Sequence, residues 1–180
     1  ETGSQYWMYQ TSGALARAYL LQGDLENCGA TLANILSPST PMDSHAKRYC
    51  WLHRADLALA EGDPDLALDI IARLVKSIPG LEGNVIPYLW RLHAETLTAV
   101  GQYQEAESIL QAAVEQVSGG HPHRWRIYAV MGDLYRQTGR QAKIEEADTA
   151  GRADVDRLAA TIFDEELSEN FQQRAYDQLQ

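Results

Sequence analysis

The sequence predicts an all-α protein built from repeated helix hairpins, and three observations lead to that fold class. A glycine recurs at nearly equal intervals, at positions 23, 62, 101 and 139. Small and large apolar residues keep fixed distances from these glycines, and most prolines fall between the helical segments. A period in this range is typical of arrays in which each repeat is one supersecondary unit.

Each recurring position has its own structural role. A small residue stands seven positions before each glycine, at Ala16, Ala55, Ala94 and Gly132. In the first three repeats a small residue follows five positions after the glycine and a branched aliphatic nine after it, at Cys28, Ala67, Ala106, Leu32, Ile71 and Leu110. Aromatic residues stand eleven positions before the last three glycines, at Trp51, Trp90 and Tyr128. Small residues let the two helices of a hairpin approach, and the large ones fill the space to the next hairpin, because one hairpin cannot bury its apolar face alone.

The first two hairpins have recognisable helix boundaries. Helices are expected over 5–22 and 25–36, joined at Gly23, followed by the proline-containing loop 37–43. Asp24 is a candidate N-cap, because its side chain can accept a hydrogen bond from the first turn of the second helix. Ser44 is the candidate N-cap of the next hairpin. Its second helix is expected to begin with Asp63 as the cap and Pro64 in the first turn, where a missing N–H costs nothing.

The third and fourth hairpins follow the same pattern with less regularity. The third is expected from Asn84 or Val85 to Val117, with Pro87 in its first turn. The fourth begins near Pro122, and its second helix is expected to reach Ile162 with Gly151 inside it, where glycine weakens a helix by up to about 1 kcal/mol relative to alanine.

A last helix is expected after Asp164, its N-cap, and to end near Leu179. Its apolar stripe is predicted at Leu167, Phe171 and Ala175, with Tyr176 and Leu179 nearby. We interpret this helix as a lid on the end of the stack. A frayed tail is the alternative.

These positions together resemble the tetratricopeptide repeat, over residues 6–151. The resemblance rests on the small residue, the turn glycine, the second small residue and the large apolar position, and Pro79 falls where that family often ends its second helix. The period is longer than is usual for the family, and Ile144 and Asp148 depart from the pattern in the fourth repeat. Such long-period arrays look like the helical regions of bacterial signalling ATPases and of LuxR-type (MalT-like) transcription activators, and the segment 159–179 resembles their capping segment.

The resemblance implies a right-handed α-α superhelix of about four hairpins with a C-terminal capping helix. Residues 1–4 are expected to be a cloning scar, residues 5–163 to form repeats over about 5–43, 44–83, 84–120 and 121–163, and residues 164–180 to form the cap. The chain is then expected to be the C-terminal part of a larger cytoplasmic regulatory protein.

The resemblance also implies a concave groove lined by the first helix of each hairpin. Residues at fixed distances before the turn glycines should point into it, and the candidates are Arg17, Tyr49, Asp56, Tyr88, Arg91, Glu95, Arg126, Asp133 and Arg136. Three carboxylates and two tyrosines among them favour a basic or hydrogen-bond-donating partner. The alternative is a solvated face with internal ion pairs, such as Arg91 with Glu95 four residues later.

Composition narrows the classes of partner. The formal net charge is −10, and residues 141–180 hold ten acidic and four basic side chains. Such a surface repels phosphate backbones, so direct nucleic-acid binding is not expected. No stretch approaches the ~18 to 20 apolar residues of a membrane span, so a soluble domain is expected. The two cysteines have no disulfide or metal spacing, which favours a reducing compartment.

The sequence contains only weak signals of a metal site or a catalytic site. His121 and His123 flank a proline, but a closed zinc site needs about four ligands. His53 and His93 stand on helices where packing is expected. No nucleophile elbow, phosphate loop or cysteine–histidine context occurs, so neither a catalytic site nor a cofactor or metal is expected.

Three functions remain open from the sequence. The first is a non-catalytic module that binds a peptide or helix of a protein partner in the groove. The second is an effector-sensing domain that holds a small molecule for an attached ATPase or DNA-binding domain. The third is a structural or oligomerisation arm that self-associates through Tyr6, Trp7 and Tyr9.

Overall fold

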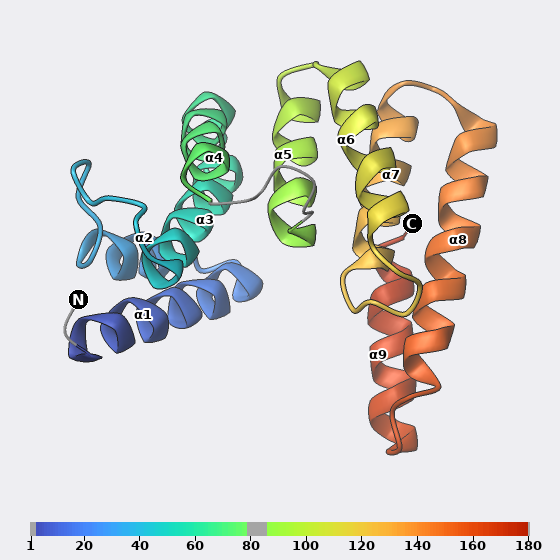
Figure 1. Cartoon of the computed structure of the whole chain (residues 1–180). Helices are drawn as coiled ribbons and strands as arrows, with labels where there is room; N and C mark the ends of the chain where they lie inside the picture. The colour runs from blue at the N-terminus through green and yellow to red at the C-terminus, as the bar shows by residue number, and fades with distance from the viewer. Residues whose placement is uncertain (1–2, 79–85, 180) are drawn as a thin grey trace. The chain divides into compact units, whose positions relative to one another are not determined.

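The computed structural model describes residues 3–78 and 86–179, and the regular structure of these residues consists of nine α-helices without a strand (Figure 1). The chain divides into two units, Glu1–Glu82 and Gly83–Gln180. The all-helical hairpin fold expected from the sequence is therefore confirmed. The residues expected to begin the third repeat, Asn84 and Val85, and also Pro79, lie outside the described residues.

Unit 1 consists of two hairpins. Its helices are α1 (Gly3–Gln22), α2 (Leu25–Ala33), α3 (His45–Ala60) and α4 (Pro64–Ser77). Helix α3 is central to the unit, because it packs against α1, α2 and α4. The core between α1, α2 and α3 contains Ala16, Cys28, Leu32, Cys50 and Leu57.

Unit 2 consists of two hairpins and a terminal helix. Its helices are α5 (Pro87–Ala99), α6 (Tyr103–Gln116), α7 (Arg124–Gln137), α8 (Gln141–Ala159) and α9 (Glu165–Asp177). Helix α7 packs against α5, α6 and α8, and α9 packs against α8. The unit therefore has the alternating contacts of stacked hairpins, with the extra helix at its end.

The four turn glycines all take the left-handed backbone conformation that ends a helix. Their φ angles are +73° at Gly23, +81° at Gly62, +80° at Gly101 and +67° at Gly139. A residue with a Cβ is strained in this region, whereas glycine is not. The turn positions that define the repeat are thus confirmed.

Replacing Gly101 with alanine is expected to lower the free energy of unfolding of unit 2 by about 1 to 2 kcal/mol. The cause is backbone strain alone, because a Cβ at this position would have no heavy atom within 4 Å. Urea denaturation followed by circular dichroism measures the change. Gly101→Asn is the matched control, since asparagine tolerates this backbone better and should lose less stability.

The helix caps also follow the sequence. The side chains of Asp24, Ser44, Asp63 and Asp164 accept hydrogen bonds from backbone N–H groups in the first turns of α2, α3, α4 and α9. Pro64 and Pro87 open α4 and α5. All these expectations are confirmed, because each depends on residues within one turn of the helix end.

The packing positions are confirmed in three repeats and change in the fourth. The small residues seven before the glycines are buried, as are the small and aliphatic residues that follow the first three glycines. In the fourth repeat Ile144 and Asp148 are half-buried, and Ala147 is the buried small residue between them. The buried face of α8 therefore begins about one turn later than those of α4 and α6.

Three helices end earlier than expected, and α1 begins earlier, at Gly3 and not at residue 5. Helix α2 ends at Ala33 and not at residue 36, because the N–H groups of Ile35 and Leu36 both bond the carbonyl of Leu32 in a tightened last turn. Helix α8 ends at Ala159 and not at Ile162, and α9 ends at Asp177 and not near Leu179. Just after α8 the N–H of Ile162 donates a hydrogen bond to the carbonyl of Ala159, which closes a turn ahead of the α9 cap.

Helix α9 is docked on unit 2, but its buried stripe differs in part from the expected one. Ala175 and Leu179 are buried in a core with Trp125, and Phe171 packs against that core. Leu167 was expected in the stripe and is instead 62% exposed. The sequence prediction was wrong there because the buried face begins one turn later, where the helix meets Trp125.

Gly151 has a packing role that explains its place inside α8. A Cβ on this residue would lie 2.6 Å from a Cδ atom of Leu179 and 3.2 Å from the Cβ of Tyr128. The missing side chain leaves a notch that Leu179 fills. The loss of helix propensity at Gly151 is therefore offset by the burial of a leucine.

Candidate recognition surface

Three of the candidate groove residues form a connected row on α5. Arg91 forms an ion pair with Glu95 one turn later, and its guanidinium lies 4.9 Å from the ring centre of Tyr88. The i, i+3 and i+4 spacings place all three side chains on one face of the helix. Arg91 and Glu95 are only 18% and 26% exposed, so the row is held in place and does not move freely in solvent.

The candidates on α7 are engaged with their neighbours. The guanidinium of Arg126 lies 4.5 Å from the ring centre of Trp125. Arg136 pairs with Asp133 at 2.8 Å and with Asp148 of α8 at 3.7 Å, and it also donates a hydrogen bond to the carbonyl of Leu179 at 3.5 Å. Arg136 thus connects the first-helix face of α7 to α8 and to the end of α9.

In unit 1 the structure places Tyr49 against α1. A Cβ on Gly13 would lie 2.6 Å from the ring of Tyr49, so this close approach requires glycine. The same ring contacts His53 edge-on, with 4.5 Å between ring centres. Arg17 and Asp56, the other two candidates of this unit, are both half-buried and have interactions of their own.

The local electrostatics differ from a simple acidic wall. Two of the expected carboxylates, Glu95 and Asp133, are paired with arginines of their own helices. A partner cation would have to compete with these arginines, so net charge alone gives this surface little attraction. The surface instead offers alternating donors and acceptors beside the Tyr88 ring, which suits a partner that matches them in position.

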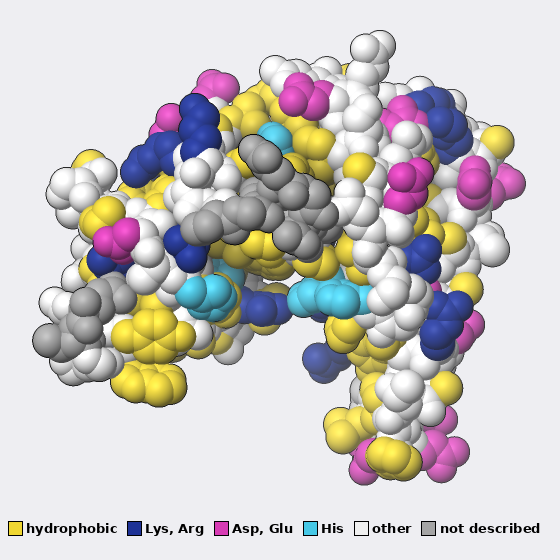
Figure 2. Space-filling view, viewed as in Figure 1, with side chains coloured by type: hydrophobic (Ala, Val, Ile, Leu, Met, Phe, Trp, Pro, Cys, Tyr) yellow, Lys and Arg dark blue, Asp and Glu magenta, His cyan; other side chains and the backbone are white. Residues whose placement is uncertain are grey.

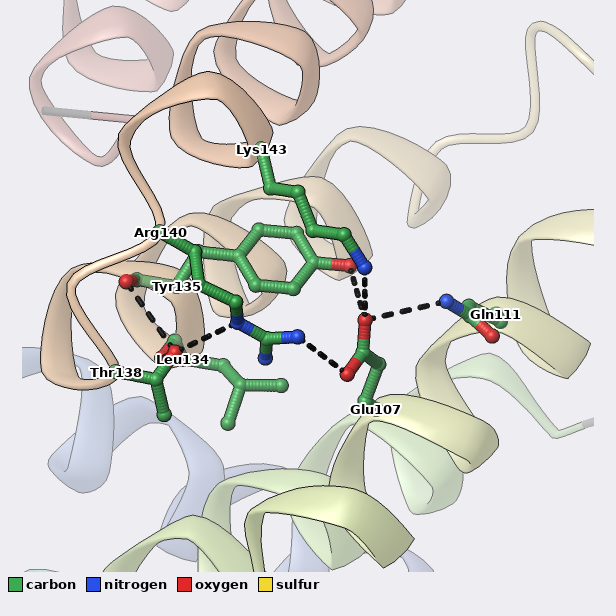
Figure 3. A network of polar contacts seen from close by, with 7 residues as sticks. All are labelled: Glu107, Gln111, Leu134, Tyr135, Thr138, Arg140 and Lys143. Carbon is green, nitrogen blue, oxygen red and sulfur yellow. Dashed lines mark hydrogen bonds and ion pairs between the residues drawn. The ribbon is translucent and has the colours of Figure 1, made fainter.

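Sequence reasoning missed an ion-pair cluster that joins the hairpins of unit 2. Glu107 of α6 accepts hydrogen bonds from Lys143 and Arg140, both at 2.7 Å, and from the hydroxyl of Tyr135 at 3.2 Å (Figure 3). Lys143 and Arg140 hold the pKa of Glu107 at about 2. Lys143 and Arg140 also lie over the Tyr135 ring. No local signal marks this cluster, because Glu107 is 28 to 36 residues from the three residues that it contacts.

Replacing Glu107 with glutamine is expected to lower the free energy of unfolding at pH 7 by about 1 to 2 kcal/mol, because two charge-assisted hydrogen bonds are lost while both cations can regain water. The folded pKa lies below the usual 4.5, so this contribution is complete above pH 4.5 and is lost as the pH falls towards 2. Urea denaturation at pH 7 and pH 3 measures both effects. Glu115→Gln, at an exposed position of the same helix, should change little.

A second cluster surrounds a buried carboxylate. Asp154 of α8 accepts hydrogen bonds from Arg124 at 3.2 Å to each oxygen and from Arg157 at 2.7 Å. Its side chain is 2% exposed. Arg124 also donates to the hydroxyl of Tyr128 at 3.1 Å. A buried charge of this kind is tolerated only when it is paired, so the cluster links α7 to α8.

Two histidines, His53 and His93, are packed on helices, and two others stand in the turn before α7. His53 is fully buried, and burial lowers its pKa to about 4. Burial also lowers the pKa of His93. The ring of His121 accepts a hydrogen bond from the backbone N–H of His123 at 3.2 Å and so stabilises the turn before α7. Within residues 3–78 and 86–179, no group of three or more His, Cys, Asp or Glu side chains could hold a metal ion.

Exposed hydrophobic side chains gather over α1 (Figure 2). Trp7 is 65% exposed and Leu21 is 76% exposed, with Met8 and Leu15 between them on the same helix. Arg17 is the one charged residue in the 20 residues of α1. Within residues 3–78 and 86–179 the structure contains no helix with the length and apolar composition of a membrane span.

Comparisons with known proteins agree with this geometry. The tetratricopeptide repeat family model matches residues 86–150. A solved structure from the functional characterisation of Pseudomonas aeruginosa pilF is 18% identical, covers 98% of this chain and 77% of its own, and has a TM-score of 0.60. A crystal structure from Podosopora anserina, described as a kinesin light chain with nearly identical tetratricopeptide-like repeats, is 16% identical, with coverages of 99% and 94% and a TM-score of 0.65.

Among curated proteins no relative matches the sequence significantly. At identities of 18% and 16% the two solved structures bear on the fold alone. Tetratricopeptide domains generally mediate protein–protein interaction and are typically non-catalytic scaffolds. Residues 86–150 thus resemble the tetratricopeptide repeat in sequence, and the chain as a whole shares its fold with the two solved structures.

Proposed function

We propose that this chain is a non-catalytic protein-interaction module that binds an extended peptide or a helix along the first-helix face of unit 2. The observation that carries the proposal is the half-buried row of Tyr88, Arg91 and Glu95 on α5. A tyrosine ring supplies rigid contact area at a low entropy cost, and a fixed ion pair supplies one donor group and one acceptor group at set positions. The row is thus preorganised for recognition.

The partner that fits this row is a segment with a basic side chain next to an acceptor group. The basic group would approach Glu95, and the acceptor would approach Arg91, so the partner replaces the internal pair with two external ones. Such exchange adds specificity more than affinity, because each new charge pair replaces one that already exists. The aromatic contact with Tyr88 would then supply most of the affinity.

A peptide selection tests the proposal. Short peptides are selected on the immobilised full chain, and the affinity of one that binds is measured with the wild-type protein and with Glu95→Lys. We expect binding to weaken by about tenfold or more, because the substitution breaks the ion pair and reverses the charge that the partner contacts. Glu169→Lys, on the exposed side of α9, is the matched control and should bind as the wild type does. Equal affinity of the wild type and Glu95→Lys would contradict the proposal.

The setting we infer is a cytoplasmic regulatory protein of which this chain is one part. The buried free thiols Cys28 and Cys50 support a reducing compartment. An effector-sensing role within a signalling ATPase or a transcription activator would instead require a small molecule that raises the melting temperature. A thermal-shift screen with metabolites, run beside the peptide measurement, separates the two functions.

A second candidate function is self-association, which the exposed apolar face of α1 favours. This face is nearly free of charge in a chain with net charge −10, so a second copy can approach it without direct repulsion. Large residues, Trp7 and Leu21, stand at its two ends, with the small residues Ala14 and Ala18 between them. An antiparallel pair of α1 helices would place Trp7 of one copy near Leu21 of the other.

Sedimentation over a range of concentrations tests this second function. We expect the average mass to rise with concentration for the wild type and to stay at one chain for Trp7→Ala. Replacement of Phe163, which is fully exposed outside α1, is the matched control and should leave the mass unchanged. A wild-type mass of one chain at all concentrations would rule out self-association.

A further inference from the structure

Each unit contains a pocket on the side of its stack opposite to the candidate recognition surface. In unit 1 the pocket has a volume of about 390 Å³ and lies between α2, α3 and α4. In unit 2 a pocket of about 400 Å³ lies between α6, α7 and α8. On α3, Trp51 and Arg54 line the pocket, whereas Tyr49 and Asp56 belong to the opposite face, as the helical period requires.

The two pockets occupy the same place in the repeat. Trp51 and Tyr128 both stand eleven residues before their turn glycines, and both line the pockets. The position eight before the glycine holds Arg54 in unit 1 and Met131 in unit 2. The position eleven after it holds Arg73 in unit 1 and Ala150 in unit 2. The two pockets are therefore built from equivalent positions of the repeat. The pocket of unit 1 has two guanidinium groups in its lining, and the pocket of unit 2 has none.

The floor of the unit 1 pocket is apolar and fixed. Leu32, Leu57 and Ile70 are buried there, and Trp51 is 6% exposed. The indole N–H of Trp51 donates a hydrogen bond to the carbonyl of Thr40 at 3.2 Å, so the polar atom of the ring is satisfied. The volume of this pocket lies at the lower end of the range for sites that hold small organic molecules, and most of its lining is apolar.

The two arginines at the rim are weakly paired. Arg54 meets Glu61 at 3.4 Å, and Arg73 meets Asp69 at 3.7 Å, with the two carboxylates 42% and 67% exposed. Exposed pairs at such distances contribute little, so a ligand can draw either guanidinium away without a large loss. Arg73 also lies 4.9 Å from the ring centre of Trp51, which keeps its charge at the edge of the apolar floor.

The geometry points to a binding site in unit 1 for a small carboxylate with an apolar body, such as an aryl or short-chain fatty acid. The apolar body occupies the floor over Trp51, and the carboxylate accepts hydrogen bonds from Arg54 and Arg73. Arginine suits this role because its planar donors match a carboxylate. The unit 2 pocket does not take such a ligand, because Met131 and Ala150 replace the arginines, and Lys143, the cation in its lining, is already paired with Glu107 at 2.7 Å.

Titration of the full chain with 4-phenylbutyrate and with its neutral counterpart 4-phenylbutanamide tests this site. Calorimetry gives the affinities, and amide NMR shifts give the location. We expect one saturable site for the carboxylate, on the order of tenfold tighter than the amide because its charge makes stronger hydrogen bonds. The shifts should fall around Trp51 and Ile70. Equal affinity of the two compounds, no saturable binding, or shifts centred on Tyr128 would each overturn the proposal.

The double variant Arg54→Met and Arg73→Ala gives the pocket the residues that unit 2 carries at the same positions. We expect it to bind the carboxylate and the amide equally. Circular dichroism and the melting temperature show whether the double variant folds. If it does not fold, the single variant Arg54→Met, which keeps the contact of Arg73 with Trp51, replaces it in the titrations. A preference for the carboxylate that survives in either folded variant at the wild-type ratio would overturn the assignment to these arginines.

Discussion

Replacing Asp154 with alanine is expected to lower the free energy of unfolding of unit 2 by about 3 to 5 kcal/mol. Its carboxylate is 2% exposed and accepts hydrogen bonds from Arg124 and Arg157. Removal of one partner of a buried ion pair leaves the other charge without compensation, which is among the most destabilising changes known for single residues. Arg124 is 21% exposed, so it can recover only part of its hydration.

Urea denaturation of the full chain, followed by circular dichroism, measures this loss. Glu145→Ala is the control, because Glu145 is an exposed acid on the same helix. Asp154→Asn should lie between the wild type and Asp154→Ala, since the amide oxygen can still accept one hydrogen bond but no longer balances the charge. A change below about 1 kcal/mol for Asp154→Ala would mean that solvent reaches Arg124 more freely than its burial indicates.

Acidification from pH 6.5 to pH 4 is expected to destabilise unit 1 by up to about 3 kcal/mol through His53. Burial lowers the pKa of His53 to about 4 in the folded state, against the ordinary 6.5 of an unfolded chain. Between these two values the unfolded chain takes up a proton that the folded chain does not, so stability falls by about 1.4 kcal/mol per pH unit. Below pH 4 both states are protonated and the loss stops.

His53→Leu isolates this effect, because it removes the titrating ring and keeps an apolar group in the core. Arg17 is the charged group that adds to the lowering of the pKa, and Tyr49 packs edge-on against the ring. The stability difference between pH 7 and pH 4 should be smaller in the variant than in the wild type by up to about 3 kcal/mol. His93→Leu is the comparison in unit 2. An identical pH dependence of the wild type and His53→Leu would contradict the prediction.

The sequence predicts best those features that depend on a few neighbouring residues. The turn before α4 is an example, with a positive φ at Gly62, the N-cap at Asp63 and Pro64 after it. These three residues lie within one turn, so their types alone are enough to predict the start of the helix. The burial of Ala55 and Ile71 also follows, because a repeated hairpin fixes which face each position occupies.

The features that were missed depend on contacts between hairpins. Glu107 and Lys143 are 36 residues apart, and nothing near either residue distinguishes them from ordinary surface charges. Leu167 follows the same i, i+4 spacing as Phe171, yet only the later part of α9 reaches the core at Trp125. The spacing of a helix gives its apolar stripe, but the length of that stripe is set by the partner surface.

The candidate recognition surface could be predicted from the sequence only in part. Helical spacing places Tyr88, Arg91 and Glu95 on one face, and the i, i+4 spacing of the last two is consistent with the ion pair between them. The role of Arg136 as a link to the end of α9 could not be foreseen, because that contact spans 43 residues. The binding role of all these residues stays a prediction for the peptide measurement to decide.

The notch at Gly151 that holds Leu179 makes unit 2 sensitive to proteolytic cleavage of the bond between Gln178 and Leu179. A protease that cut after Gln178 would withdraw a fully buried side chain, open the wall beside Trp125, and remove the carbonyl that Arg136 contacts. Loss of the Leu179 side chain in this way would act like a large-to-small substitution in the interior, which costs about 2 to 5 kcal/mol for a leucine.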